Sequence, residues 1–324
     1  MTQMKNNEQS GKDLFDQEEQ REASLPDDET TAVIDDKSVV VLTTEELTPV
    51  LDISSSTVDD AVHALTKTLD WLQLYEAVVT LRRIVVHHSD LVTTTHVEGL
   101  LRPLALEGDS LRSSPCKNGL LACAECFEFL PRSTLERPLL GGAHPEVLDV
   151  ILRRSVCEKK FLRDAALIAA QKLATHLAGK PLLAATARFG TNKNGKLCGT
   201  AANIIATSLE RMQKDQQTVA KGSEYLKAVY RALAAFRESK DGTARAEATT
   251  GFQRLGELVG AKELEIGLKE ALPGAGQAGI VARILKDAFP RTNAAKSRPK
   301  TSLRDRVRQD ANGRTGAMTV TRDR

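Results

Sequence analysis

The sequence predicts an all-α fold, an α-solenoid built from stacked helical hairpins with a polar tail at each end. Three observations support it. Small or apolar residues recur with helical spacing at positions 115, 119, 123, 127 and 130. The same pattern returns three times further along the chain. Alanine and leucine dominate the apolar residues while aromatic residues make up only 4%, a composition that suits helices packed closely on helices.

The repeated pattern has a measurable period. The first apolar residue of each copy is Pro115, Leu162, Leu197 or Ala244, and successive starts lie 47, 35 and 47 residues apart. Their average of about 43 falls in the roughly 40–47 residue range of HEAT and armadillo repeats. The period therefore predicts a HEAT or armadillo-like array.

Composition limits the class of protein. With 41% hydrophobic and 27% charged residues, the 324-residue chain can bury a core. It has no basic start followed by an apolar run, and no apolar stretch of about 18 residues. The five cysteines all lie in or beside apparent helices. We therefore expect a cytoplasmic protein with reduced thiols and no membrane partner.

The charge is concentrated in two opposite tails. Residues 1–50 hold 13 acidic and 4 basic residues, and residues 291–324 hold 10 basic and 3 acidic ones. We expect an acidic, largely disordered segment at 1–45, the repeat domain at 46–290 and a basic disordered tail at 291–324. Residues 38–42 could form a short strand, but an extended segment lying on the helical body is the preferred interpretation.

The first half of the domain divides into helices at clear signals. Three serines before Thr57 indicate a helix start, and that helix should reach about residue 69. The next begins at Asp70-Trp71 and stops near His87, and another covers about 94–106. After the helix of 111–130, residues 135–142 should be irregular because they contain Pro138 and two glycines. A helix from 145 to about 156 follows.

The second half continues the alternation. Pro181, Pro273 and Pro290 mark helix boundaries. Residues 221–236 form a strongly amphipathic helix, and two shorter helices should follow Gly260 and end by Phe289. Pairing the helices yields five hairpins and an incomplete sixth. One hairpin cannot cover its own apolar face, so the hairpins must stack side by side.

Stacking places every turn inside a hairpin along one edge. These turns are residues 70–71, 109–113, 158–160, 192–196 and 240–243. Trp71 would then share the edge with a row of basic side chains, an arrangement suited to an acidic protein surface. Charged turns are also typical of solvated loops, and a tryptophan at a helix start often packs as a core or staple residue. The repetition across hairpins favours the binding edge.

Several short motifs in these turns resemble one known family. They are DW at 70–71, LRSS at 111–114, FLRD at 161–164, KN at 193–194 leading to LERM at 209–212, and ARAE at 244–247. In order and spacing they resemble a TOG domain, the tubulin-binding HEAT array, closest to the crescerin and CLASP type. The resemblance covers residues 46–260, about two-thirds of the chain.

The resemblance implies a function and a set of contact residues. TOG domains bind the curved αβ-tubulin dimer or the microtubule lattice through the turns inside their hairpins, and crescerin-type members act in cilia and flagella. Carried over by position, the contact residues would be Trp71, Arg112, Ser113, Lys117, Lys159, Lys160, Arg163, Lys193, Asn194 and Arg245. The chain departs from the family at Leu74 and Cys198, where basic residues are usual, and at Pro115, where a β-branched residue is usual.

Other motifs are weaker. Cys123 and Cys126 form a CxxC, but no second CxxC or spaced histidine pair accompanies it, so a core position is favoured over a metal or redox site. Residues 273–279 fit GxGxxG without the strand that a nucleotide site needs, so they are interpreted as a turn. His87-His88 with Asp90 is interpreted as a polar helix end, and we find no catalytic constellation. The sequence therefore predicts no cofactor and no enzymatic activity.

Three hypotheses stay open. The leading one is a non-enzymatic tubulin- or microtubule-binding protein of the cytoskeleton, in cilia or flagella, with a basic tail as a second weak contact. The second is a HEAT scaffold for another acidic partner, such as an axonemal protein, with no tubulin affinity. The third is nucleic-acid binding by the tail, which is disfavoured because no aromatic residue follows Phe289. Phosphorylation of Ser297, Thr301 or Ser302 would weaken the tail's attraction.

Overall fold

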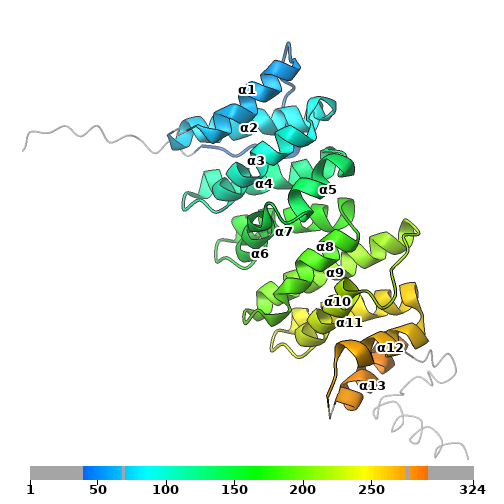
Figure 1. Ribbon diagram of the computed structural model, residues 1–324. Coiled ribbons are helices and arrows are strands. Elements are labelled where there is room, and N and C mark those ends of the chain that lie inside the picture. The colour runs from blue at the N-terminus through cyan, green and yellow to red at the C-terminus, as the bar shows by residue number, and fades with distance from the viewer. Residues whose placement is uncertain (1–38, 68–69, 275–276, 291–324) are drawn as a thin grey trace, which may run out of the picture. The chain divides into compact units, whose positions relative to one another are not determined.

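The chain forms an all-α solenoid. The computed structural model describes residues 39–67, 70–274 and 277–290, in which thirteen α-helices and three short 3-10 helices occur and no strand is present (Figure 1). The helices follow one another along the stack from α1 to α13, and they form two layers. The all-α repeat architecture predicted from the sequence is confirmed.

One layer holds the first helix of each hairpin and the other holds the second. The first helices are α1 (Ser55–Thr66), α3 (Thr94–Gly108), α5 (Arg132–Leu140) with α6 (Pro145–Arg154), α8 (Lys180–Ala187), α10 (Glu224–Arg237) and α12 (Ala261–Ala271). The second helices are α2 (Trp71–His87), α4 (Ser113–Phe129), α7 (Lys160–His176), α9 (Gly195–Lys214), α11 (Gly242–Val259) and α13 (Gln277–Ala288). The 3-10 helices are η1 (Thr44–Glu46), η2 (Ser89–Leu91) and η3 (Arg188–Thr191). Each second helix packs on the next one along the stack, so the described residues contain six hairpins.

The repeated apolar pattern forms the core. Leu162, Ala166, Ala170 and Leu173 of α7 are all buried, and the matching residues of α4, α9 and α11 are buried as well. Small side chains in this pattern allow close packing of helices. At Gly119, an added Cβ would lie 2.5 Å from a backbone nitrogen of α3. The sequence pattern therefore selects the faces that meet, and its small residues set how closely they meet.

One predicted loop is a helix. Residues 135–142 were expected to be irregular because of Pro138, yet α5 covers Arg132–Leu140 with that proline inside it. Leu135, Pro138 and Leu139 are buried on one face of α5. The carbonyl four residues before the proline belongs to Thr134, which is only partly buried. Burial of the apolar face thus outweighs the loss of one helical hydrogen bond.

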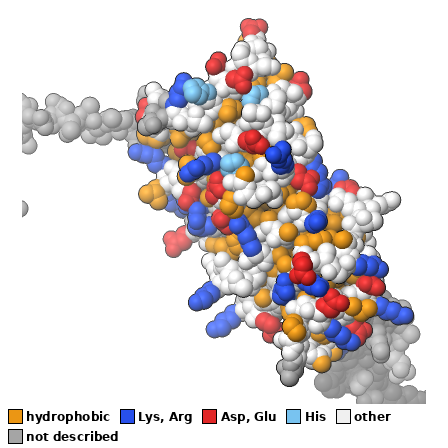
Figure 2. Space-filling model, viewed as in Figure 1, with side chains coloured by type: hydrophobic (Ala, Val, Ile, Leu, Met, Phe, Trp, Pro, Cys, Tyr) orange, Lys and Arg blue, Asp and Glu red, His pale blue; other side chains and the backbone are white. Residues whose placement is uncertain are grey.

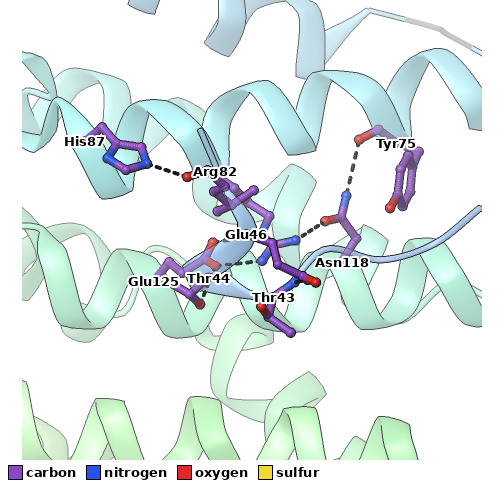
Figure 3. A network of polar contacts seen from close by, with 9 residues as sticks. Thr43, Thr44, Glu46, Tyr75, Arg82, His87, Asn118 and Glu125 are labelled. Atoms are coloured by element: carbon purple, nitrogen blue, oxygen red, sulfur yellow. Dashed lines mark hydrogen bonds and ion pairs between the residues drawn. The ribbon is translucent and has the colours of Figure 1, made fainter. Parts of the chain in front are cut away.

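An extended segment at the N-terminal end of the body lies on α2 and α4. We call residues 40–47 the strap (Figure 3). The Tyr75 hydroxyl donates to the carbonyl of Val40 (3.3 Å), the ring Nε2 of His87 hydrogen-bonds the carbonyl of Leu47 (2.8 Å), and the Leu47 side chain is buried. The described part of residues 38–42 is therefore extended and contacts the body. The Tyr75 contact reaches Val40, six residues before residue 46, where the repeat domain was expected to begin. Residues 1–38 of the acidic segment and the whole basic tail lie outside the described residues.

A buried ion pair lies beneath the strap. Arg82 of α2 donates from Nε and a terminal nitrogen to the two carboxylate oxygens of Glu125 in α4, at 2.8 and 2.7 Å. The other terminal nitrogen of Arg82 donates to Asn118 (2.9 Å), whose amide donates to the carbonyl of Tyr75 (3.2 Å). Arg82 is fully buried and the Glu125 side chain is 3% exposed. Bidentate pairing with further hydrogen bonds is what permits two charges inside a core.

The structure also shows where the other motifs of the sequence lie. Cys123 and Cys126 are free thiols buried in α4, and burial raises the pKa of Cys123 to about 12. His87 is bound to the strap. The glycine-rich stretch 273–279 lies between α12 and α13, and its residues 275–276 are outside the described part.

Across the described ranges, every helix is too short or too polar to span a lipid bilayer.

Candidate protein-binding edge

The turns inside the hairpins lie along one edge of the body, which we call the turn edge. It consists of residues 70–71, 109–113, 155–160, 192–196 and 238–243 and the first turn of the second helix that follows each. Local capping defines three of these turns. Asp70 accepts from two backbone N–H groups of α2, Asn194 from two of α9, and Asp241 from one of α11. In Figure 2, lysine and arginine side chains are spaced along the margin of the body where these turns lie.

The first two turns meet through an aromatic contact. Trp71 is the first residue of α2 and is half-buried. The guanidinium of Arg112, in the turn before α4, lies 4.8 Å from the centre of its ring. This cation–π contact holds the indole against the neighbouring turn and leaves part of it accessible. The two residues that the sequence assigned to separate turns are therefore in direct contact.

The second and third turns meet through a hydrogen bond. The ammonium of Lys159 donates to the hydroxyl of Ser113 at 2.7 Å. Arg153 and Arg154, at the end of α6, also bind the second turn: Arg153 pairs with the Asp109 carboxylate (2.7 Å), and Arg154 donates to the Asp109 carbonyl (2.6 Å). Sequence reasoning missed both arginines. The available signal was a basic pair in the last turn of α6, one hairpin after the turn that contains Asp109.

In four of the six second helices that the structure describes, α4, α7, α9 and α11, the fourth residue holds a donor that binds the preceding turn. Arg163 of α7 donates to the carbonyls of Cys157 and Glu158, at 2.9 and 3.4 Å. Arg245 of α11 donates to the carbonyls of Ser239 and Lys240, at 2.8 and 2.9 Å. These two predicted contact residues therefore also close their own turns. Their positive charge nevertheless remains at the edge.

Cysteines take the same position in α4 and α9. The thiol of Cys116 in α4 donates to the Gly108 carbonyl at 3.0 Å, and that of Cys198 in α9 donates to the Asn192 carbonyl at 3.3 Å. Cys198 is one of the points where the chain departs from the TOG pattern. The thiol preserves the contact with the turn and removes the charge.

The other predicted contact residues differ in what they bind. Lys160 is exposed and pairs with Asp164 (2.6 Å). Lys193 is exposed, and Asn194 uses its side-chain oxygen to cap α9. Lys117 is half-buried, and its charge acts on Glu46 of the strap. The edge thus presents exposed cations at its third and fourth turns.

Three exposed apolar side chains belong to the first three turns. Leu72 in α2, Leu111 before α4 and Phe161 in α7 are 42%, 98% and 46% exposed. They were not among the predicted contact residues, although Leu111 and Phe161 stand inside the quoted motifs. Apolar residues at turn positions were the available signal. Apolar side chains beside cations are the composition expected of a protein-binding surface.

Comparison with known proteins finds distant structural similarity. No protein-family model and no curated protein sequence matches the chain. A solved structure described as "Crescerin uses a TOG domain array to regulate microtubules in the primary cilium" is 14% identical with a TM-score of 0.48, and covers 77% of this chain and 92% of its own. A designed armadillo repeat protein in complex with a (KR)4 peptide is 15% identical with a TM-score of 0.38, and covers 72% and 99%. At such identities and scores these likenesses assign no function.

Proposed function

We propose that this chain is a non-enzymatic protein of the cytoskeleton that binds αβ-tubulin or the microtubule lattice through its turn edge. The observation that carries the proposal is the contact of Trp71 with Arg112 beside the contact of Ser113 with Lys159. An aromatic anchor and two cations thereby come together on three consecutive turns. Aromatic and arginine side chains contribute most binding energy at protein interfaces, and cations steer the encounter with an acidic partner.

The sequence resemblance to TOG domains supplies the identity of the partner. The carried-over contact residues Trp71, Arg112 and Lys159 belong to the set that the turn edge presents. In this proposal the protein regulates or stabilises microtubules, in cilia or flagella, and the basic tail adds a second weak attraction.

A microtubule pelleting assay tests the proposal. The variant Trp71→Glu/Arg112→Glu/Lys117→Glu replaces the aromatic anchor of the first turn by an acidic residue and reverses two charges at the second turn. We expect at least a tenfold loss of microtubule affinity, with helical content by circular dichroism unchanged. Binding of the wild type should also weaken as salt rises from about 50 to about 200 mM, because the Debye screening length shortens over that range. Unchanged pelleting by the variant would reject the edge.

A matched control carries the same substitutions away from the turn edge. Ile266, Lys214 and Lys221 are one exposed apolar residue and two exposed cations near the connections between hairpins. Their triple replacement by glutamate has the same change in net charge. It should pellet like the wild type if the turn edge is the binding surface.

A second candidate is a scaffold for a different acidic protein. It is favoured by the fourth helical positions, where Arg163 and Arg245 donate to their own turns and Cys198 carries no charge. This candidate predicts no pelleting with microtubules, together with a partner captured by the wild type and lost with the Trp71→Glu triple variant.

A further inference from the structure

Thr44 is the strap residue whose side chain contacts the buried ion pair. Its hydroxyl donates to Glu125 at 2.8 Å, on the oxygen that also accepts from Arg82 (Figure 3). The neighbouring Thr43 is exposed and starts the short helix η1. The strap is therefore bound to the buried ion pair through one threonine side chain, and the adjacent threonine faces solvent.

The other contacts of the strap are hydrogen bonds at its two ends and a short apolar face. The hydroxyl of Tyr75 and the ring of His87 bind the ends, Leu47 is buried, and Val41 packs partly buried against the core. Glu45 and Glu46 directly follow Thr44 and are exposed. A hydroxyl followed by carboxylates has the charge pattern that acid-directed protein kinases select.

We propose that Thr44 is a phosphorylation site and that a phosphate on it releases the strap from α2 and α4. In the reaction, Oγ1 of Thr44 attacks the γ-phosphorus of ATP bound to the kinase, its proton passes to the base of the kinase, and ADP leaves. The hydroxyl needs a transient opening of the strap to enter the kinase, and the small number of strap contacts permits it.

The phosphate cannot be accommodated in the closed arrangement. The modified oxygen has no proton to donate to Glu125, and about two negative charges would lie beside a carboxylate that is 3% exposed. Arg82 offers little to a new partner, because three of its five N–H groups already donate to Glu125 and Asn118 and its single positive charge is already balanced by Glu125. Repulsion at low dielectric therefore favours the detached strap.

Release of the strap alters the charge of the turn edge. Glu46 lies near Lys117: its pKa is lowered, chiefly by hydrogen bonds to Thr43, with Lys117 contributing. Departure of the strap takes the exposed carboxylates of Glu45 and Glu46 away from α4, the helix that carries Lys117, which favours an acidic partner at the edge. This consequence rests on the proposed function, whereas the release itself does not.

Hydrogen exchange on the full-length chain tests the release. Amide exchange in a peptide covering residues 39–50 would be compared in wild type, Thr44→Asp, Thr43→Asp and Thr44→Val. We expect exchange in Thr44→Asp to accelerate by roughly tenfold or more, which corresponds to about 1.4 kcal/mol of repulsion between the new carboxylate and Glu125. Thr43→Asp is the matched control, since aspartate also caps a helix start and places the same charge one residue away. Thr44→Val, which loses only the hydrogen bond, should fall between the two.

Two further measurements complete the test. Incubation with a purified acid-directed kinase and Mg-ATP should place phosphate on Thr44, located by mass spectrometry, with the same acceleration of exchange. Equal exchange in the two aspartate variants, or no phosphate on Thr44, would overturn the proposal. In the pelleting assay Thr44→Asp should bind microtubules more tightly than Thr43→Asp. A wild type that never pellets refutes the proposed function alone, because the exchange result still decides the release.

Discussion

Replacing Glu125 by glutamine should destabilise the solenoid more than any comparable change at its surface. Glutamine keeps the shape of the side chain but removes the negative charge, so Arg82 stays fully buried without a counter-ion. One of the two short contacts from Arg82 also becomes an encounter between two N–H donors. The perturbation therefore leaves an uncompensated charge in the interior.

The expected cost follows from the burial of both partners. Removing one member of a buried ion pair costs about 3–5 kcal/mol. For a body of this size, each kcal/mol lowers the unfolding midpoint by roughly 2–4 °C, so Glu125→Gln should lower it by roughly 6–20 °C. The exposed pair of Arg211 and Asp215, with side chains 47% and 35% exposed, serves as a control. Asp215→Asn should cost only a few tenths of a kcal/mol.

The assay is unfolding in urea, followed by circular dichroism, on a double-mutant cycle. Arg82→Met/Glu125→Leu removes both charges, so it should be less destabilising than the sum of the two single changes, by about 2 kcal/mol or more. Stacked repeats can unfold in stages, so the slope of each transition must be compared as well as its midpoint. Additive single changes, or a cost of Glu125→Gln similar to that of Asp215→Asn, would refute the reasoning.

Three further predictions concern packing, pH and thiol reactivity. Gly119→Ala should cost about 2 kcal/mol or more because its Cβ would lie 2.5 Å from the α3 backbone; Gly279→Ala, with no atom within 4 Å, should instead raise stability by up to about 1 kcal/mol in urea unfolding. Burial raises the pKa of Glu107, and its Oε2 is buried without a hydrogen-bond partner, so its ionised form opposes folding above that pKa. Glu107→Gln should therefore add about 1 kcal/mol of stability at pH 8, with the gain shrinking as pH falls toward 4, and a gain independent of pH would contradict this cause. Iodoacetamide should label half-exposed Cys157 before Cys123, whose pKa burial raises to about 12; mass spectrometry that finds equal rates would exclude that order.

The candidate edge could be predicted from sequence in part because three of its turns are specified locally. Asp70, Asn194 and Asp241 accept hydrogen bonds from N–H groups two or three residues ahead, and such caps are visible in any sequence. The repeated apolar pattern places the second helices in one layer, and the turns before them then share an edge. The contacts of Trp71 with Arg112 and of Ser113 with Lys159 could not be predicted, because each joins residues more than forty positions apart in neighbouring hairpins.

Some errors in the sequence interpretation also have a local cause. The proline rule predicted a loop at 135–142, but burial of one face of α5 against the body outweighs it. The first helix was expected to start at Thr57, whereas it starts at Ser55 with Ser54 as its cap. Three adjacent serines offer nearly equivalent caps, and packing of Val58 and Ala61 selects among them.

The sequence alone determined most of the helices, their period of about 43 residues and the positions of the turns, since these depend on hydrogen bonds and apolar spacing within a few residues of each other. Only the tertiary structure decided that the strap covers α2 and α4, that Arg82 meets Glu125 beneath it, and that the fourth residue of a second helix closes the preceding turn. Those arrangements depend on which surfaces are left uncovered after the hairpins stack. A charged residue in a sequence does not reveal whether it will face water or a partner of opposite charge in the core, because burial is a property of the whole packed body.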